Sequence, residues 1–425
     1  MRVGQQPERV LGTADAVVIG LGSMLGAGVF TVFGPAAAAA GSWTGAALGL
    51  AALVAFANAT SSAQLAAQHP HGGGTFVYGR EQLGPWAGFT AGWGFVAGKS
   101  ASCAAMALVV SANLISAGLL PAWSFKPGAV AVLLALVLVN LAGVSKTARL
   151  ARVIVALVLA GLVLLAAGLW GSGAAQAHAV LAGPAPGPAG VLQAAGLLFF
   201  AFAGYARVAT LGGEVRDPRR TIPRAIVAAL GIVVGVYAAV WVTTAAVLGP
   251  ERLAASSAPV ADAAARLGPA AAWGAGLLAA IGAIGALLGL LAGVSRTAQA
   301  MAAAGELPRV LAELHPVRGV PQAAELGLAA VMCVLIAAAD LRTAIGFSSF
   351  GVLVYYAVAN AAALTQRGAH RRYPRALQWT GIIGCLALAF SLPWQSVAAG
   401  TAVFAVGLAV RAVRLRSQRK GRSRL

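Results

Sequence analysis

Two apolar stretches of this sequence contain glycines at positions that would interrupt a helix. The stretch GLGSMLGAGVF, residues 20–30, holds four glycines, and LLFFAFAGYARVATLGGEV, residues 197–215, is interrupted around Gly204. Glycine lets the backbone leave helical geometry and lets a ligand approach closely. A helix that unwinds near residues 23–28 exposes N–H groups that carry about half a positive charge, while its freed carbonyls accept hydrogen bonds. The pattern predicts non-covalent binding of a zwitterion.

Helix packing is the alternative interpretation of the first glycine cluster. Gly22 and Gly26 have the GxxxG spacing that lets two membrane helices approach each other. The interruption around Gly204 falls at the matching position of a second block of helices, which favours the binding interpretation.

Two charged residues, Lys99 and Arg207, lie inside apolar stretches. Ionisable groups at membrane depth are costly and usually face a cavity or a partner. Lys99 is a candidate for a coupling site because a buried lysine can release its proton. Whether it lines a substrate pocket or an ion site stays open. For Arg207, snorkelling or pairing near the cytoplasmic half is the alternative to a role in the site.

The elements that must position these residues are membrane helices. Of the 425 residues, 60% are hydrophobic and 10% are charged, and crossing a bilayer takes about 20 apolar residues per helix. We therefore predict an all-α polytopic membrane protein with twelve transmembrane helices. They lie near residues 13–38, 43–67, 86–118, 127–144, 150–170, 190–211, 224–248, 271–295, 322–339, 342–364, 376–391 and 394–411.

The basic residues lie mainly on alternate loops. With the N-terminus inside, 24 of the 30 Lys and Arg fall on the inner loops and tails, and four fall on the outer loops. This asymmetry is the positive-inside rule, and it predicts a multi-pass protein of the cytoplasmic membrane with both termini cytoplasmic. The net charge of +19 therefore does not indicate nucleic acid. The basic tail at 412–425 is interpreted as a stop-transfer flank, with attraction to anionic membrane lipid as a secondary role.

The predicted helices divide into two blocks of five. After a cytoplasmic N-terminus at 1–12, the first repeat covers 13–170 and the second covers 190–364, with two additional helices at 376–411. Because five is odd, the second block crosses in the opposite sense, which gives inverted repeats. The interrupted first helix of each block is the expected place of a transporter's midplane site.

Other classes of site find little support. The five histidines are scattered over loops without ligand spacing, and the three cysteines fall inside separate predicted segments. The stretch AGWGFVAGKS lacks the first glycine of a phosphate-binding loop and lies in a membrane helix. We therefore predict no metal, no cofactor and no enzymatic activity.

Four long motifs resemble the amino acid, polyamine and organocation (APC) transporter superfamily. They are GLGSMLGAGVF, HPHGGGTFVYGREQLGPWAGFTAGW, FFAFAGYARVATLGGEVRDPRRTIPRAI and SRTAQAMAAAGELPRVLAELHPVRGVPQ. The resemblance, which extends to uncharacterised actinobacterial-type amino acid permeases, implies a LeuT-like five-plus-five inverted repeat with broken helices 1 and 6. It implies a carboxylate cradle at Ala27 and Gly28, with Ser23 near it. It further implies ammonium-binding carbonyls on the two broken segments, at Met24, Leu25, Phe200 and Ala203, with Phe200 also at the position of an aromatic lid. The glycines of the two breaks, Gly26 and Gly204, are assigned to the same substrate site.

Coupling and substrate charge can be considered from the same residues. Some members of the superfamily keep a membrane lysine on the fifth helix, which this sequence lacks, and the eighth segment has no hydroxyl before Ser295. Proton coupling or exchange is therefore preferred over sodium coupling. No acidic residue maps to the middle of a membrane segment, so the expected substrate is a neutral amino acid. An acidic amino acid, or another amine or organic cation, is the alternative. The oligomeric state stays open.

Overall fold

The computed structural model describes residues 11–69, 73–143, 147–181, 187–209, 211 and 214–422. Over these ranges the regular structure is helical, apart from one parallel bridge between Leu11 and Val215. The predicted N-terminus (1–12), the loop at 70–72 and the end of the predicted tail (412–425) lie wholly or partly outside the described residues.

Each of the twelve predicted segments coincides with helical structure. The helices are, in chain order, α1 to α3 (Thr13–Met24, Ala27–Thr31 and Phe33–Ala40), α4 (Thr44–Gln68), α6 (Pro85–Ser116), α7 (Phe125–Leu141), α8 (Thr147–Gly171), α9 with α10 (Pro188–Phe202 and Ala206–Ala209), α11 (Pro218–Ala255), α13 (Pro269–Ala303), α14 (Gln322–Ala338), α15 (Leu341–Leu364), α16 (Arg375–Ser391) and α17 (Trp394–Arg422). Among the described residues, ten helical spans are long and apolar enough to cross a membrane. The two others, α14 and α16, have 17 residues each.

Shorter elements connect these helices and were not foreseen as separate units. They are α5 (Thr75–Leu83), α12 (Pro259–Ala264) and the 3₁₀ turns η1 (Gly41–Trp43), η2 (Ala122–Ser124), η3 (Ala177–Leu181), η4 (Ala203–Tyr205), η6 (Ala265–Leu267), η7 (Arg309–Ala312) and η8 (Gly368–His370). The long helix α11 is kinked at Gly249, whose φ is 71°, next to Pro250. Proline cannot continue the hydrogen-bond pattern of a helix. The membrane part of α11 therefore ends near the predicted boundary at 248.

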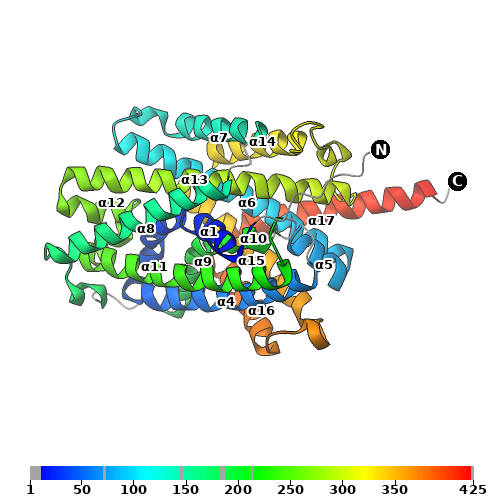
Figure 1. The fold of residues 1–425 in the computed structure, drawn as a ribbon, viewed down its shortest axis with the longest axis horizontal. Coiled ribbons are helices and arrows are strands. Elements are labelled where there is room, and N and C mark those ends of the chain that lie inside the picture. Colours follow the sequence, from blue (N-terminus) through cyan, green and yellow to red (C-terminus); the bar gives the residue numbers. More distant parts are fainter. Residues whose placement is uncertain are drawn as a thin grey trace.

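The interrupted helices lie in the middle of the bundle. In Figure 1, α1 and α10 are surrounded by α6, α8, α11, α13 and α15. The helix α1 packs against α8, α11 and α13, and it also contacts η4 and α10 of the second broken segment. Both breaks are therefore enclosed by protein, which satisfies the requirement that irregular backbone at membrane depth avoids lipid.

Large apolar side chains cover the perimeter of the bundle. Leu138 on α7, Val163 on α8 and Val334 on α14 are each 66% exposed. Seven of the nine tryptophans are also exposed, and they lie near helix ends; they are Trp43, Trp86, Trp123, Trp170, Trp273, Trp379 and Trp394. Apolar perimeters flanked by exposed tryptophans are typical of proteins whose solvent is the bilayer.

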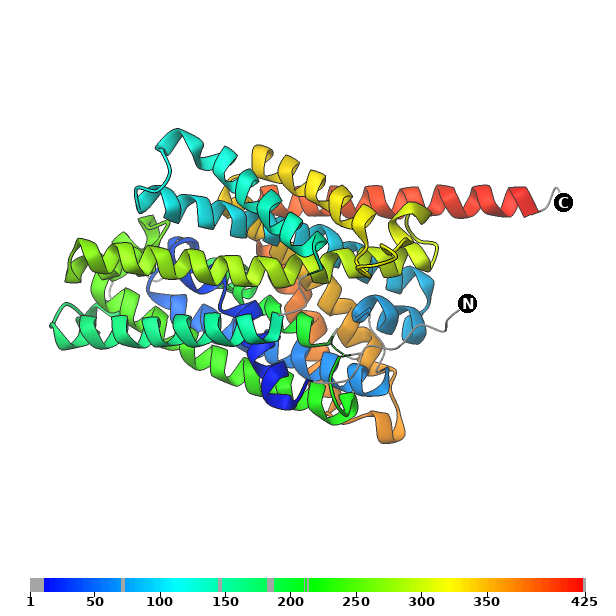
Figure 2. The same ribbon diagram turned by 45° about the horizontal axis from the view of Figure 1, so that its top comes forward.

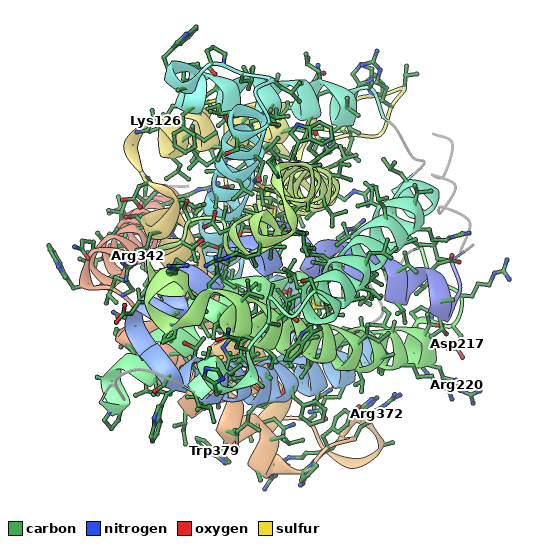
Figure 3. The ribbon with its side chains drawn as sticks, turned by 90° about the vertical axis from the view of Figure 1, so that its left-hand side faces the viewer. Lys126, Asp217, Arg220, Arg342, Arg372 and Trp379 are labelled. Atoms are coloured by element: carbon green, nitrogen blue, oxygen red, sulfur yellow. The ribbon has the colours of Figure 1, made fainter. Side chains whose placement is uncertain are left out.

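The charged residues gather at the ends of the bundle. The last turns of α17 extend beyond the neighbouring helices at one end (Figure 2). The first turn of α11 and the loop before α16 meet at this end, where the Arg372 side chain donates a 3.2 Å hydrogen bond to the carbonyl of Arg219. Viewed along the bundle, Asp217, Arg220 and Arg372 lie on one flank, and Lys126 and Arg342 lie on the other (Figure 3). We call the end that carries the Arg219–Arg372 contact the arginine-rich end.

Candidate functional site

The first helix breaks over two residues. The helix α1 ends at Met24, Leu25 has a ψ of 32°, and Gly26 has a ψ of −144° before α2 begins at Ala27. The predicted interruption near residues 23–28 is therefore present. The first N–H groups of a helix have no acceptor within it, so this break presents N–H groups from α2 and carbonyls from α1.

The second break is tighter and touches the first. The helix α9 ends at Phe202, and the turn η4 follows before α10. A Cβ added at Gly204 would overlap the carbonyl of Ser23, and one added at Gly28 would lie 2.7 Å from the Cα of Ala201. Only glycine allows the two interrupted backbones to approach this closely.

A tyrosine on α11 bridges the two breaks. The Tyr237 hydroxyl lies 2.6 Å from the carbonyl oxygen of Met24 and 2.9 Å from that of Ala201. Since a hydroxyl has one proton, Tyr237 donates to one of these carbonyls at a time. Its ring is also in edge contact with Phe202. This residue is not among those expected from the sequence, although a single tyrosine in the apolar stretch GIVVGVYAAV was a visible signal.

Lys99 reaches the second break from α6. Its ammonium donates a 2.9 Å hydrogen bond to the carbonyl of Ala203, and the residue is only 4% exposed. A protein cation therefore already occupies one of the carbonyls that the resemblance assigns to a substrate ammonium. With Met24 accepting from Tyr237, two of the four predicted carbonyls have protein donors in this conformation.

The two breaks and Lys99 line one small cavity of about 20 Å³. Its lining residues are Ser23, Phe95, Lys99, Ser102, Met106, Phe200, Ala203, Gly204, Arg207, Ala286, Leu290 and Gly293. A single water needs about 10–15 Å³, so an amino acid requires the surrounding helices to move apart. Among these lining residues two are cationic and none is acidic.

A second cavity, of about 60 Å³, continues from the first. It shares Ser23 and Arg207 with the first cavity and runs between α1, α8 and α13. Because Leu150, Ala151 and Ala292 line it, this cavity lies toward the ends of α8 and α13 that carry Arg152 and Arg296. It marks a route from the breaks to the arginine-rich end.

Arg207 takes part in a charged cluster at the end of this route. The Glu214 carboxylate lies 3.7 Å from the Arg207 guanidinium and 2.9 Å from that of Arg296 on α13. The pairing interpretation of Arg207 therefore agrees with the structure, and Arg207 also lines both cavities. Asp217 stands at the start of α11 in a left-handed conformation with a φ of 43°, and its side chain makes no cap hydrogen bond.

The remaining predicted site residues belong to the first break, next to the cavity, and are not among its lining residues. Met24, Leu25, Gly26, Ala27 and Gly28 are all buried beside it, and Ser23 donates its hydroxyl to the carbonyl of Ile19 at 2.9 Å. The structure thus places six of the predicted site residues on one cavity, and the other five adjoin it; the six are Ser23, Lys99, Phe200, Ala203, Gly204 and Arg207. The side chains of Phe95, Ser102 and Met106 from α6 were not foreseen.

A protein-family model described as amino acid permease matches residues 11–411. The chain belongs to the amino acid permease family. An uncharacterised transporter of Mycobacterium tuberculosis is 54% identical to this permease, over 97% of this chain and 93% of that protein. A branched-chain amino acid permease of Bacillus subtilis is 25% identical, over 95% and 92%. The human cationic amino acid transporter 4 is 29% identical, over 82% of this chain and 58% of that protein.

The fold of this permease matches a solved structure. The crystal structure of MhsT in complex with L-phenylalanine aligns with a TM-score of 0.66 and 16% identity, and the match covers 93% of this chain and 100% of that chain. The likeness shows the fold, so the prediction of an all-helical, LeuT-like membrane protein with interrupted helices 1 and 6 is confirmed. The predicted residue boundaries of the two repeats stay a prediction.

Proposed function

We propose that this permease is a secondary active transporter that moves neutral amino acids across the cytoplasmic membrane by alternating access. The observation that carries the proposal is the direct contact of two interrupted helices beside a cavity at the centre of the bundle. Unpaired backbone groups at such a contact can bind both ends of a zwitterion without charged side chains.

In the proposed site the substrate carboxylate binds the N–H groups of Ala27 and Gly28, with Ser23 nearby. The substrate ammonium binds the carbonyls of Leu25 and Phe200, since that of Ala203 accepts a hydrogen bond from Lys99 and that of Met24 shares the Tyr237 hydroxyl with Ala201. The Phe200 side chain lines the cavity and is the proposed aromatic lid. Alternating access requires the cavity to open toward each end in turn, and the second cavity supplies the route to the arginine-rich end.

A neutral substrate is favoured by the charges around the cavity. With Lys99 and Arg207 among its lining residues and no acidic lining residue, a cationic side chain would meet repulsion. The human relative is named a cationic amino acid transporter, but this cavity lacks a counter-charge for such a substrate. An acidic amino acid is the second candidate, because either cation could pair with its side-chain carboxylate.

The proposal also names the ion that is coupled to transport and the orientation of the permease in the membrane. We assign the coupled proton to Lys99, with exchange of one amino acid for another as the alternative mode. The arginine-rich end faces the cytoplasm in this proposal, since the positive-inside rule assigns 24 of the 30 basic residues to that side.

The test is counterflow uptake by purified permease in proteoliposomes. Labelled neutral, acidic and basic amino acids are compared, and pH and sodium gradients are then varied for each positive. Saturable, sodium-independent uptake of a neutral amino acid is the expected result. Uptake restricted to acidic amino acids would select the second candidate, and absence of uptake of every amino acid by folded protein would refute the proposal.

A further inference from the structure

The largest cavity described in this permease lies away from the helix breaks. It has a volume of about 370 Å³ and is lined by residues of α6, α13, η7, α14, α15 and α17, all apolar except Ser100; among them are Trp93, Leu311, Val331 and Val403. Protein interiors normally leave few voids larger than a water molecule. This cavity is different because it is open at the perimeter of the bundle, where its lining residue Val331 is 50% exposed. It therefore offers space for a ligand that comes from the surroundings of the helices.

The position of the cavity points to the lipid phase. The helix α14 packs against α6, α7 and α13, whereas α17 packs against α6, α15 and α16. Residues of α6 line the cavity between these two outer helices. Gly327 on α14 lines it as well, and a Cβ added there would meet only the Leu311 side chain, at 4.0 Å. An apolar chain can enter between α14 and α17 from the surrounding bilayer.

The mouth of the cavity lies at the membrane surface. The segment 304–320 between α13 and α14 contributes Leu307 and Leu311 to the lining, and it also carries Val310, Leu314 and Val317, which are 54%, 52% and 87% exposed. Exposed apolar side chains that alternate with charged ones are typical of segments seated at the headgroup level. This segment lies beside α17 at the arginine-rich end (Figure 2).

The charge at this mouth is positive. Glu306 accepts hydrogen bonds from Arg80 at 3.2 Å and from Arg411 at 2.7 and 2.8 Å, so its charge is matched. Within the described segment 304–320, the remaining charged residues are the exposed Arg309, Glu313 and Arg318, so the arginines outnumber the carboxylate. An anionic headgroup is attracted to such a surface more strongly than a zwitterionic one.

We propose that this cavity binds one acyl chain of an anionic phospholipid whose headgroup lies beside Arg309. Moving the chain from the bilayer into the cavity gives no hydrophobic gain, because lipid tails are as apolar as the lining. The gain comes from filling a void that otherwise lacks packing contacts, together with attraction of the headgroup. This inference does not depend on the proposed substrate or on transport.

Native mass spectrometry of the detergent-solubilised, full-length permease tests this site. The protein is titrated with phosphatidylglycerol or phosphatidylcholine, and retained lipids are counted. We expect one retained phosphatidylglycerol and weaker retention of phosphatidylcholine. Arg309→Gln should reduce phosphatidylglycerol retention about fivefold, while Arg342→Gln at the opposite end should leave it unchanged.

A pair of matched substitutions on α14 tests the cavity itself. Gly327→Phe places a ring in the cavity and should reduce retention by about tenfold or more. Leu326→Phe, at the neighbouring position with a 49% exposed side chain, is the control. Val331→Trp, one turn further along, fills the same cavity if Gly327→Phe does not fold.

Three results would overturn the proposal. The first is that the cavity-filling variants retain as much phosphatidylglycerol as the Leu326→Phe control. The second is that the wild type retains phosphatidylglycerol and phosphatidylcholine equally. The third is that the wild type is a dimer which becomes monomeric when the cavity is filled by substitution, while lipid retention stays constant. The last result would identify a second copy of the chain as the occupant.

Discussion

Gly204→Ala tests the contact of the two breaks on which the proposed function rests. The added methyl group would overlap the Ser23 carbonyl and would lie 2.7 Å from the Cγ of Met24. Gly204 is not among the positive-φ glycines, so alanine can adopt its backbone conformation and the overlap is the main perturbation. Because the overlapping atom belongs to the backbone, it cannot be relieved by rotating a side chain.

The magnitude follows from the cost of overpacking, which is about 1–3 kcal/mol. This cost applies only to conformations in which the two breaks touch. It therefore lowers the population of those conformations by about 5- to 150-fold relative to open ones. We expect the rate of amino acid uptake at low substrate concentration to fall by a similar factor. The apparent melting temperature should fall by about 2–6 °C, on the scale of large single domains.

The assay compares uptake in proteoliposomes and thermal unfolding of the same purified variants. Gly231→Ala on α11 is the matched control, because a Cβ added at Gly231 meets no atom within 4 Å. Alanine is favoured over glycine within a helix by about 1 kcal/mol, so this control should keep its uptake and should keep or slightly raise its melting temperature. A Gly204→Ala permease with wild-type uptake and wild-type melting temperature would refute the reasoning.

Three further substitutions test neighbouring contacts. Tyr237→Phe removes the donor shared by the Met24 and Ala201 carbonyls. We expect the free energy of unfolding to fall by about 1–3 kcal/mol, as measured by thermal unfolding. An unchanged melting temperature would contradict this expectation. Lys99→Met removes a buried charge, so we expect stability to be unchanged or raised by up to about 4 kcal/mol, and a large loss would show that the ammonium is needed for folding. Glu214→Gln weakens the pairing with Arg207 and Arg296. We expect a cysteine introduced at Ala292 to react faster with a thiol reagent applied at the arginine-rich end, and no change would exclude Glu214 from controlling that route.

The helices of this permease were predictable because their solvent imposes a simple pattern. A span must be apolar for about 20 residues, so all twelve segments could be placed, and the glycines of the first break marked a real interruption at Leu25 and Gly26. The short elements were less predictable. The turn η7 carries Val310 and Leu314 among charged residues, and such a mixed segment has no clear hydrophobic period.

The candidate site was predictable in its backbone and less so in its side chains. Glycine spacing and the family resemblance placed Ser23, Gly28 and Gly204 together. This was possible because each backbone break is marked by glycines within one short stretch of sequence. The contact between Lys99 and the carbonyl of Ala203 joins residues 104 positions apart. Which face of α6 meets α9 depends on tertiary packing, so sequence could mark Lys99 as unusual but could not name its partner. Tyr237 was missed for the same reason.

Because Lys99 lines the cavity, the sign of the pH dependence of substrate affinity should differ between neutral and acidic amino acids. Two unit charges about 6 Å apart interact by about 3 kcal/mol at an effective dielectric constant of 20. The ammonium of a neutral amino acid beside a protonated Lys99 is repelled, so its affinity should rise as pH rises and Lys99 loses its proton. A side-chain carboxylate is attracted instead, so the affinity of an acidic amino acid should fall over the same range. Even if the zwitterion's own carboxylate offsets half of this interaction, about 1.4 kcal/mol remains, which is a tenfold change in affinity.

Substrate affinity measured against pH in the wild type and in Lys99→Met distinguishes the cases. The wild-type slope gives the substrate class, and a slope that survives in Lys99→Met would remove Lys99 from the coupling mechanism.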